Sequence, residues 1–156
     1  MFRHHPVLTL ITTLYLGAVA WLTLGPQPTA LVRASGLYRI LRELHSHPST
    51  AWVTYSFVQY GSNLLMFLPV GVFLVLLFGR RLWWFAVIMG TLLSASIEFT
   101  QLFIPGRVSD VRDLMSNSLG TLIGVLVALI LTWPAAARRR RDALLAHPRT
   151  GGVRTA

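Results

Sequence analysis

Three carboxylates gather in one short part of the sequence. The chain has five acidic residues, and Glu98, Asp110 and Asp113 all fall within the stretch 94–124. Glu98 also lies inside an apolar run, 82–104, that is long enough to cross a bilayer, where an ionisable side chain is costly and marks a functional site by default. Carboxylates in such a place can act as a general base and its partner acid, hold a cation, or relay protons. We therefore take these three residues as the catalytic candidates.

Polar side chains accompany the carboxylates at helical spacing. Glu98 and Gln101 are three residues apart and lie on one face of a helix, and Asp113 shares a face with Asn117 in the same way. At about 1.5 Å per residue, Asn63 and Glu98 lie roughly 9 Å inside the same membrane surface. We expect one polar cluster at this side of the bilayer, formed by Asn63, Glu98, Gln101, Arg107, Asp110, Asp113 and Asn117.

Two interpretations of this cluster stay open. In one, the polar side chains hydrogen-bond across the bundle while Arg107 or Arg112 neutralises Glu98, so that the cluster only fixes helix packing. In the other, the cluster lines a cleft at the outer surface and binds or transforms a polar headgroup. The chain has no cysteine, and the nearby hydroxyls have no evident activating base other than Glu98. We predict neither a metal site nor a cofactor.

Long apolar stretches must position these residues. Of the 156 residues, 54% are hydrophobic and only 12% are charged. Four stretches each approach the roughly 20 residues that a spanning helix needs, namely 7–24, 57–78, 82–104 and 114–133. The sequence thus predicts an all-α integral membrane protein, with a bundle of four transmembrane helices over residues 1–133.

Local signals add detail to this bundle. One expectation for the loop 25–56 is a short interfacial helix, because its apolar residues share a helical face; an irregular loop is the alternative, because a glycine interrupts the pattern. Pro69, two residues before Gly71, removes a backbone donor and predicts a kink. Gly120 and Gly124 form a G-x-x-x-G pair that lets another helix approach closely.

The arginines indicate an orientation. If the N-terminus is cytoplasmic, nine of the 14 basic residues lie in inner segments, so the positive-inside rule favours two cytoplasmic termini in a multi-pass protein of the cell membrane. The segment 134–156 is predicted to be a basic cytoplasmic tail without regular structure, whose arginines attract anionic lipid headgroups. Because membrane topology explains the net charge of +9, we predict no nucleic-acid partner.

Ala18-Val19-Ala20 resembles a signal-peptidase site, but the apolar run continues past it, which favours an uncleaved first helix.

Three separated motifs occur in a fixed order. They are N-L-L-M-F-L-P-V-G at 63–71, S-I-E-F-T-Q at 96–101 and R-V-S-D-V-R-D-L-M-S-N-S-L-G at 107–120. On these motifs the chain resembles the VanZ-like family, named for a teicoplanin-resistance protein, over about 7–133. The resemblance implies a four-helix membrane bundle and a cell-envelope role such as low-level glycopeptide resistance. It brings no established reaction. The long loop and the arginine tail are not part of the motif pattern, so the resemblance transfers no substrate preference that they encode.

Three functions follow as hypotheses. The first is a non-enzymatic envelope protein whose outer cleft binds a lipid-linked or glycopeptide headgroup, so that the bilayer and this headgroup are the expected partners. The second is an intramembrane enzyme acting on a lipid-linked envelope substrate, with Glu98 as general base and Asp110 and Asp113 as partners. The third is a small proton-coupled transporter, which would need a homo-oligomer because four helices leave little room for a path. The sequence favours the non-enzymatic hypothesis without excluding catalysis.

Overall fold

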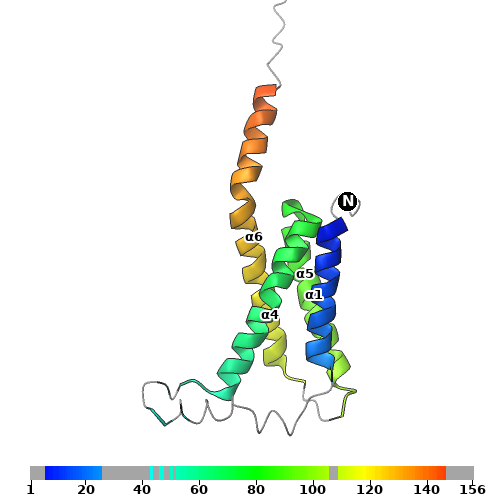
Figure 1. The fold of residues 1–156 in the computed structure, drawn as a ribbon, viewed down its shortest axis with the longest axis vertical. Coiled ribbons are helices and arrows are strands. Elements are labelled where there is room, and N and C mark those ends of the chain that lie inside the picture. The colour runs from blue at the N-terminus through cyan, green and yellow to red at the C-terminus, as the bar shows by residue number, and fades with distance from the viewer. Residues whose placement is uncertain are drawn as a thin grey trace, which may run out of the picture.

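The protein is a bundle of four α-helices (Figure 1). The structure, a computed structural model, describes residues 6–25, 43, 46–47, 50, 52–105 and 109–146, and only the backbone at 135, 136 and 139–146. The regular elements of this described part are all helical: α1 (Pro6–Leu24), α4 (Tyr55–Phe78), the 3-10 turn η2 (Arg80–Leu82), α5 (Trp83–Gln101) and α6 (Val111–Ala146). The predicted all-α, four-helix architecture is confirmed.

Each α-helix contributes one candidate membrane span. The spans are Pro6–Leu24, Tyr55–Phe78, Arg80–Gln101 and Val111–Pro134. Large apolar side chains project outward along them, as at Trp21 and Leu131, which suits a surface facing lipid. The chain is therefore a multi-pass membrane protein. The interfacial helix expected within 25–56 lies largely outside the described residues.

The helices alternate in direction, which creates two distinct ends (Figure 1). At one end α1 and α5 finish and α4 and α6 start; we call it the loop end. At the other end α1 starts, η2 connects α4 to α5, and α6 continues beyond the bundle; we call it the tail end. The sequence places all three candidate carboxylates near the loop end.

Helices α4 and α6 form the most extensive contact in the bundle. A Cβ atom added at Gly120 would lie 2.2 Å from the Leu64 carbonyl oxygen, and one added at Gly124 would lie 2.0 Å from the Leu68 carbonyl oxygen. At Gly71 the corresponding distance, to the Thr121 carbonyl oxygen, is 2.1 Å. Because no side chain larger than hydrogen fits at these positions, the two backbones approach directly, as small residues allow in membranes. Pro69 lies inside α4, close to this contact.

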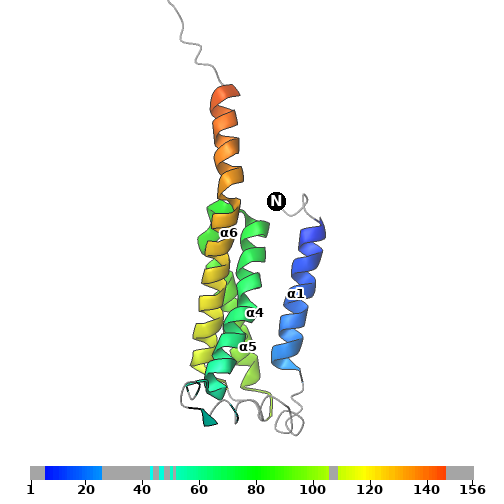
Figure 2. The ribbon, with the colours of Figure 1, turned by 60° about the vertical axis from the view of Figure 1, so that its left-hand side comes forward.

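Helices α5 and α1 complete the bundle from one side. Helix α5 contacts both α4 and α6, while α1 stands at the edge, next to α4 and α5 (Figure 2). The Tyr15 hydroxyl of α1 donates to the Met66 carbonyl of α4 at 2.8 Å. The buried apolar core is made of Val19, Phe67, Val70, Leu74, Val75, Ala86, Ile97, Val125 and Ala128.

Helix α6 is longer than the sequence predicts. Pro134 was expected to begin a tail without regular structure, but the helix continues through it to Ala146. Its 36 residues correspond to about 54 Å at 1.5 Å per residue, well beyond a hydrocarbon core of about 30 Å. Alanine, arginine and leucine, which dominate 135–146, are strong helix formers, so the loss of one donor at Pro134 does not end the helix. Residues 147–156 lie outside the described part.

Candidate functional site at the loop end

Glu98 joins α5 to the start of α6. Its Oε2 atom accepts a hydrogen bond from the Ser109 hydroxyl at 2.7 Å and another from the Asp110 backbone N–H at 3.0 Å. The side chain is only 8% exposed. It also lies beside the first turn of α6, where the helix dipole favours negative charge. Glu98 thus fixes the entry of α6 through two hydrogen bonds.

Asp110 is the N-cap of α6. Its Oδ1 accepts the backbone N–H of Arg112 at 2.8 Å, and its carbonyl accepts the N–H of Asp113 at 2.8 Å. In a capping box, the side chain at position 113 would accept a hydrogen bond from the backbone N–H of the capping residue, Asp110. Here Glu98 of α5 takes that place, so the side chain of Asp113 is left for another partner.

Asp113 connects α6 to α4. The Gln59 side-chain amide donates to both carboxylate oxygens, at 3.2 Å and 3.0 Å. Asn63, one turn further along α4, lies beside the same carboxylate. Both side chains are neutral amides, so they orient Asp113 without forming an ion pair.

Deeper in the bundle, Asn117 connects α6 to α5. Its Nδ2 donates to the Ser94 hydroxyl at 2.9 Å, and the residue is only 3% exposed. Its other polar atom, Oδ1, is buried without a hydrogen-bond partner, as is the hydroxyl oxygen of Ser118. Buried polar atoms usually find partners, since leaving one unpaired costs roughly 1–3 kcal/mol. Within the described part of the chain, α6 thus carries two buried polar atoms without a hydrogen-bond partner, close to the carboxylates in sequence.

Not every expected member joins this network. Gln101 is buried but turns towards α1, where its Nε2 donates to the Thr23 carbonyl at 3.0 Å. Arg107, expected to face the carboxylates, lies outside the described residues. Arg112 is exposed and donates to the Tyr60 hydroxyl at 3.2 Å. The hydrogen bonds that the structure gives to the three carboxylates thus come from hydroxyl, amide and backbone groups.

Comparison with known proteins identifies a family. A family model described as VanZ/LLP1 matches residues 12–132, most of the chain. The chain belongs to the VanZ-like family. Neither the curated proteins nor the solved structures include a match. The predicted family is therefore confirmed, and the sequence motifs that indicated it can be placed in the fold.

The VanZ-like motifs meet along α4, α5 and α6. The first, 63–71, runs from Asn63 beside Asp113 to Gly71 at the close contact with α6. The second, 96–101, carries Glu98 in the last turns of α5. The third, 107–120, supplies Ser109 and the first turns of α6. Three stretches that are distant in sequence thus bring Asn63, Glu98, Ser109, Asp110 and Asp113 to the loop end of this VanZ-like chain, while Gln59 lies just before the first motif.

Two members of the network were not predicted. Gln59 lies one helical turn before Asn63 on α4, and this spacing was the signal that could have identified it. The other is Ser109, whose hydroxyl donates to Glu98. We call Gln59, Asn63, Glu98, Ser109, Asp110 and Asp113 the loop-end network. No group of three histidine or acidic residues placed to hold a metal ion occurs within the part of the chain that the structure describes.

Proposed function

We propose that this VanZ-like protein acts in the cell membrane as an envelope protein that lowers sensitivity to glycopeptides such as teicoplanin. In this proposal the loop end faces outward, both termini are cytoplasmic, and the loop-end network binds the headgroup of a lipid-linked or glycopeptide-like molecule. The arginine distribution supports the orientation, and family membership supports the envelope role.

One observation carries the proposal. Two carboxylates from different parts of the network, Glu98 and Asp113, are each held by neutral donors at the same end of the bundle. A carboxylate oxygen can accept more than one hydrogen bond, and a charged acceptor binds N–H and O–H donors more strongly than a neutral one. A headgroup rich in ammonium, amide or hydroxyl donors therefore matches this end.

A direct binding experiment tests this proposal. Purified full-length protein would be titrated with a lipid-linked cell-wall precursor, with teicoplanin, and with phosphatidylcholine as a comparison lipid. We expect saturable binding to the precursor or to teicoplanin, weakened about tenfold or more in Glu98→Gln, because a hydrogen bond to a charged group contributes about 1.5–3 kcal/mol. Glu43→Gln is the matched control, since Glu43 is exposed and lies in the loop on the same side of the membrane.

Two results would contradict the proposal. The first is the absence of saturable binding to the precursor and to teicoplanin. The second is an equal loss of binding in Glu98→Gln and Glu43→Gln, which would indicate a general effect of negative charge.

A second candidate function is favoured by one distance. The hydroxyl of Ser109 lies 2.7 Å from the buried Glu98 carboxylate, and a hydroxyl hydrogen-bonded to a base is the arrangement that activates a nucleophile. An intramembrane enzyme could use Glu98 as general base towards a lipid-linked substrate. Turnover of such a lipid by purified protein, lost in both Glu98→Gln and Ser109→Ala, would support this function. Turnover that survives Glu98→Gln would refute the role of Glu98.

A further inference from the structure

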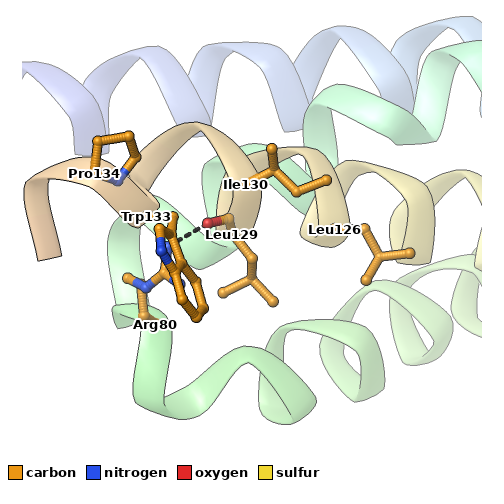
Figure 3. A pocket seen from close by; sticks show the side chains of 6 residues that line it. All are labelled: Arg80, Leu126, Leu129, Ile130, Trp133 and Pro134. Atoms are coloured by element: carbon orange, nitrogen blue, oxygen red, sulfur yellow. Dashed lines mark hydrogen bonds between the residues drawn. The ribbon is translucent and has the colours of Figure 1, made fainter. Parts of the chain in front are cut away.

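A second feature lies at the tail end, away from the carboxylates. It is a groove of about 400 Å³ between the start of η2 and α6, lined by Arg80, Leu126, Leu129, Ile130, Trp133 and Pro134. Figure 3 shows Arg80 and Trp133 next to each other at one end of the groove, and Leu126 at the other. The groove is therefore cationic at one end and apolar along the rest of its length.

The guanidinium of Arg80 is held in place at this cationic end. Its Nη1 donates one hydrogen bond to the Leu129 carbonyl and another, 2.5 Å long, to the Thr132 hydroxyl. The guanidinium also lies 5.6 Å from the centre of the Trp133 ring, within the range of a cation–π interaction. Both hydrogen bonds start from one nitrogen, whereas a guanidinium carries five N–H donors. Arg80 is thus positioned in advance with donors available for an anionic oxygen.

The apolar part of the groove follows α6 inside its membrane span. Leu126 and Ile130 are exposed, and with Trp133 they recur at helical spacing along one face of the helix. From Leu126 to Pro134 the helix rises about 12 Å at 1.5 Å per residue, which is enough to accommodate part of one acyl chain. Trp133 lies where the span ends, the depth at which tryptophan favours the membrane interface.

Charge complementarity identifies the occupant as an anionic amphiphile. Arg81 follows Arg80 and is exposed, Arg138 is exposed one turn beyond Pro134, and arginines also occupy 139–141. Positive charge at a membrane surface attracts anionic lipids by about 1 kcal/mol per arginine. The same charge would repel the tail end of a second copy of this chain. A free phosphate would gain nothing from the apolar walls.

We propose that this groove binds one anionic phospholipid, with its phosphate on Arg80 and one acyl chain along Leu126 and Ile130. The site is separate from the loop-end network and is independent of the function proposed for that network. Because Arg80 bridges η2 and α6, a lipid bound there also joins the α4–α5 turn to α6.

The test compares two pairs of matched variants of the full-length protein. After delipidation in detergent, each protein is titrated with phosphatidylglycerol and with phosphatidylcholine of identical acyl chains, and bound lipid is counted by native mass spectrometry. Arg80→Gln and Arg81→Gln remove the same charge from the same turn, but only Arg80 lines the groove. Ile130→Trp fills the groove, whereas Leu131→Trp adds the same bulk to a neighbouring exposed position outside it.

We expect wild type to bind one phosphatidylglycerol at least about tenfold more tightly than phosphatidylcholine, because both lipids carry a phosphate but the choline cation of phosphatidylcholine cancels its charge and is repelled by the arginines at this end. Arg80→Gln should abolish this preference, while Arg81→Gln, which changes only an exposed charge, should alter affinity by less than about threefold. Ile130→Trp should weaken binding about tenfold and Leu131→Trp should leave it unchanged, because only the former blocks the apolar walls. Ile130 and Leu131 are 70% and 72% exposed, so both tryptophan variants are expected to fold.

Several outcomes would overturn the proposal. Equal losses in Arg80→Gln and Arg81→Gln would show general attraction to charge, and equal binding of the two lipids would show that the groove does not select a lipid of net negative charge. Binding that survives Ile130→Trp, or glycerol phosphate competing as well as the intact lipid, would show that no acyl chain occupies the groove. A shift of the delipidated protein to dimers that Ile130→Trp prevents would assign the groove to a second copy.

Discussion

Replacing Gly124 by alanine should separate the two helices at the centre of the bundle. The added Cβ would lie 2.0 Å from the Leu68 carbonyl oxygen, about 1.4 Å short of the 3.4 Å at which ordinary contact begins. The Leu68 oxygen belongs to the backbone and the Cβ would be fixed rigidly to the backbone of residue 124, so no side-chain rotation can relieve the overlap and α4 must move away from α6. Overpacking of this kind costs about 1–3 kcal/mol, and separation also weakens the close contacts between the helices. We expect Gly124→Ala to lower the free energy of unfolding by about 2 kcal/mol.

Gly61→Ala is the matched control for this substitution. Gly61 also lies inside a helix of the same pair, but a Cβ added there meets nothing within 4 Å. Alanine is favoured over glycine in a helix by up to about 1 kcal/mol, so Gly61→Ala should leave stability unchanged or raise it. Unfolding in sodium dodecyl sulfate, followed by far-ultraviolet circular dichroism, measures both variants. If Gly124→Ala and Gly61→Ala have equal stabilities, the close approach of α4 and α6 is wrong.

Three further predictions concern single polar groups, each measured as the free energy of unfolding in the same assay. Asp110→Ala should lower it by about 1 kcal/mol through loss of the α6 cap, while Asp110→Asn should retain it; equal losses would exclude a capping role. Tyr15→Phe should lower it by about 0.6–1.7 kcal/mol, because the bond to the Met66 carbonyl is lost, and no change would show that α1 is not held there. Ser118→Ala should raise it slightly, by up to about 1 kcal/mol, because a buried unpaired hydroxyl is removed; a clear loss would mean that the hydroxyl has a partner.

The four helices could be predicted from sequence because the bilayer allows few alternatives. In hydrocarbon every backbone polar group must bond within its own segment, so a long apolar stretch becomes a helix. The predicted stretch 57–78 accordingly corresponds to α4, Tyr55–Phe78. The end of α6 was predicted less well, because beyond Pro134 the choice between helix and irregular tail depends on helix propensity in a polar environment rather than on the bilayer.

Helical periodicity identified polar faces but not their partners. Glu98 and Gln101 share a face of α5, yet Glu98 contacts the start of α6 and Gln101 contacts α1. Asp113 was expected in one cluster with Asn63 and Glu98; it lies beside Asn63, but its carboxylate accepts its hydrogen bonds from Gln59 of α4. The rotation of each helix about its own axis decides which side chains meet. That rotation follows from close packing at glycines such as Gly120, and the sequence of one helix does not show which neighbouring helix packs there. The depth of a polar side chain in the membrane was therefore easier to predict than its hydrogen-bond partner.

The central claim is that the loop-end network is a functional site rather than a packing device, and drug sensitivity tests it most directly. Wild type, Glu98→Gln and Glu43→Gln would be expressed in a teicoplanin-sensitive Gram-positive host, with the inhibitory concentration of teicoplanin and the amount of folded membrane protein recorded together. We predict that wild type and Glu43→Gln protect the host, and that Glu98→Gln accumulates normally but does not. Protection by Glu98→Gln, or protection that falls only in proportion to folded protein, would contradict the claim.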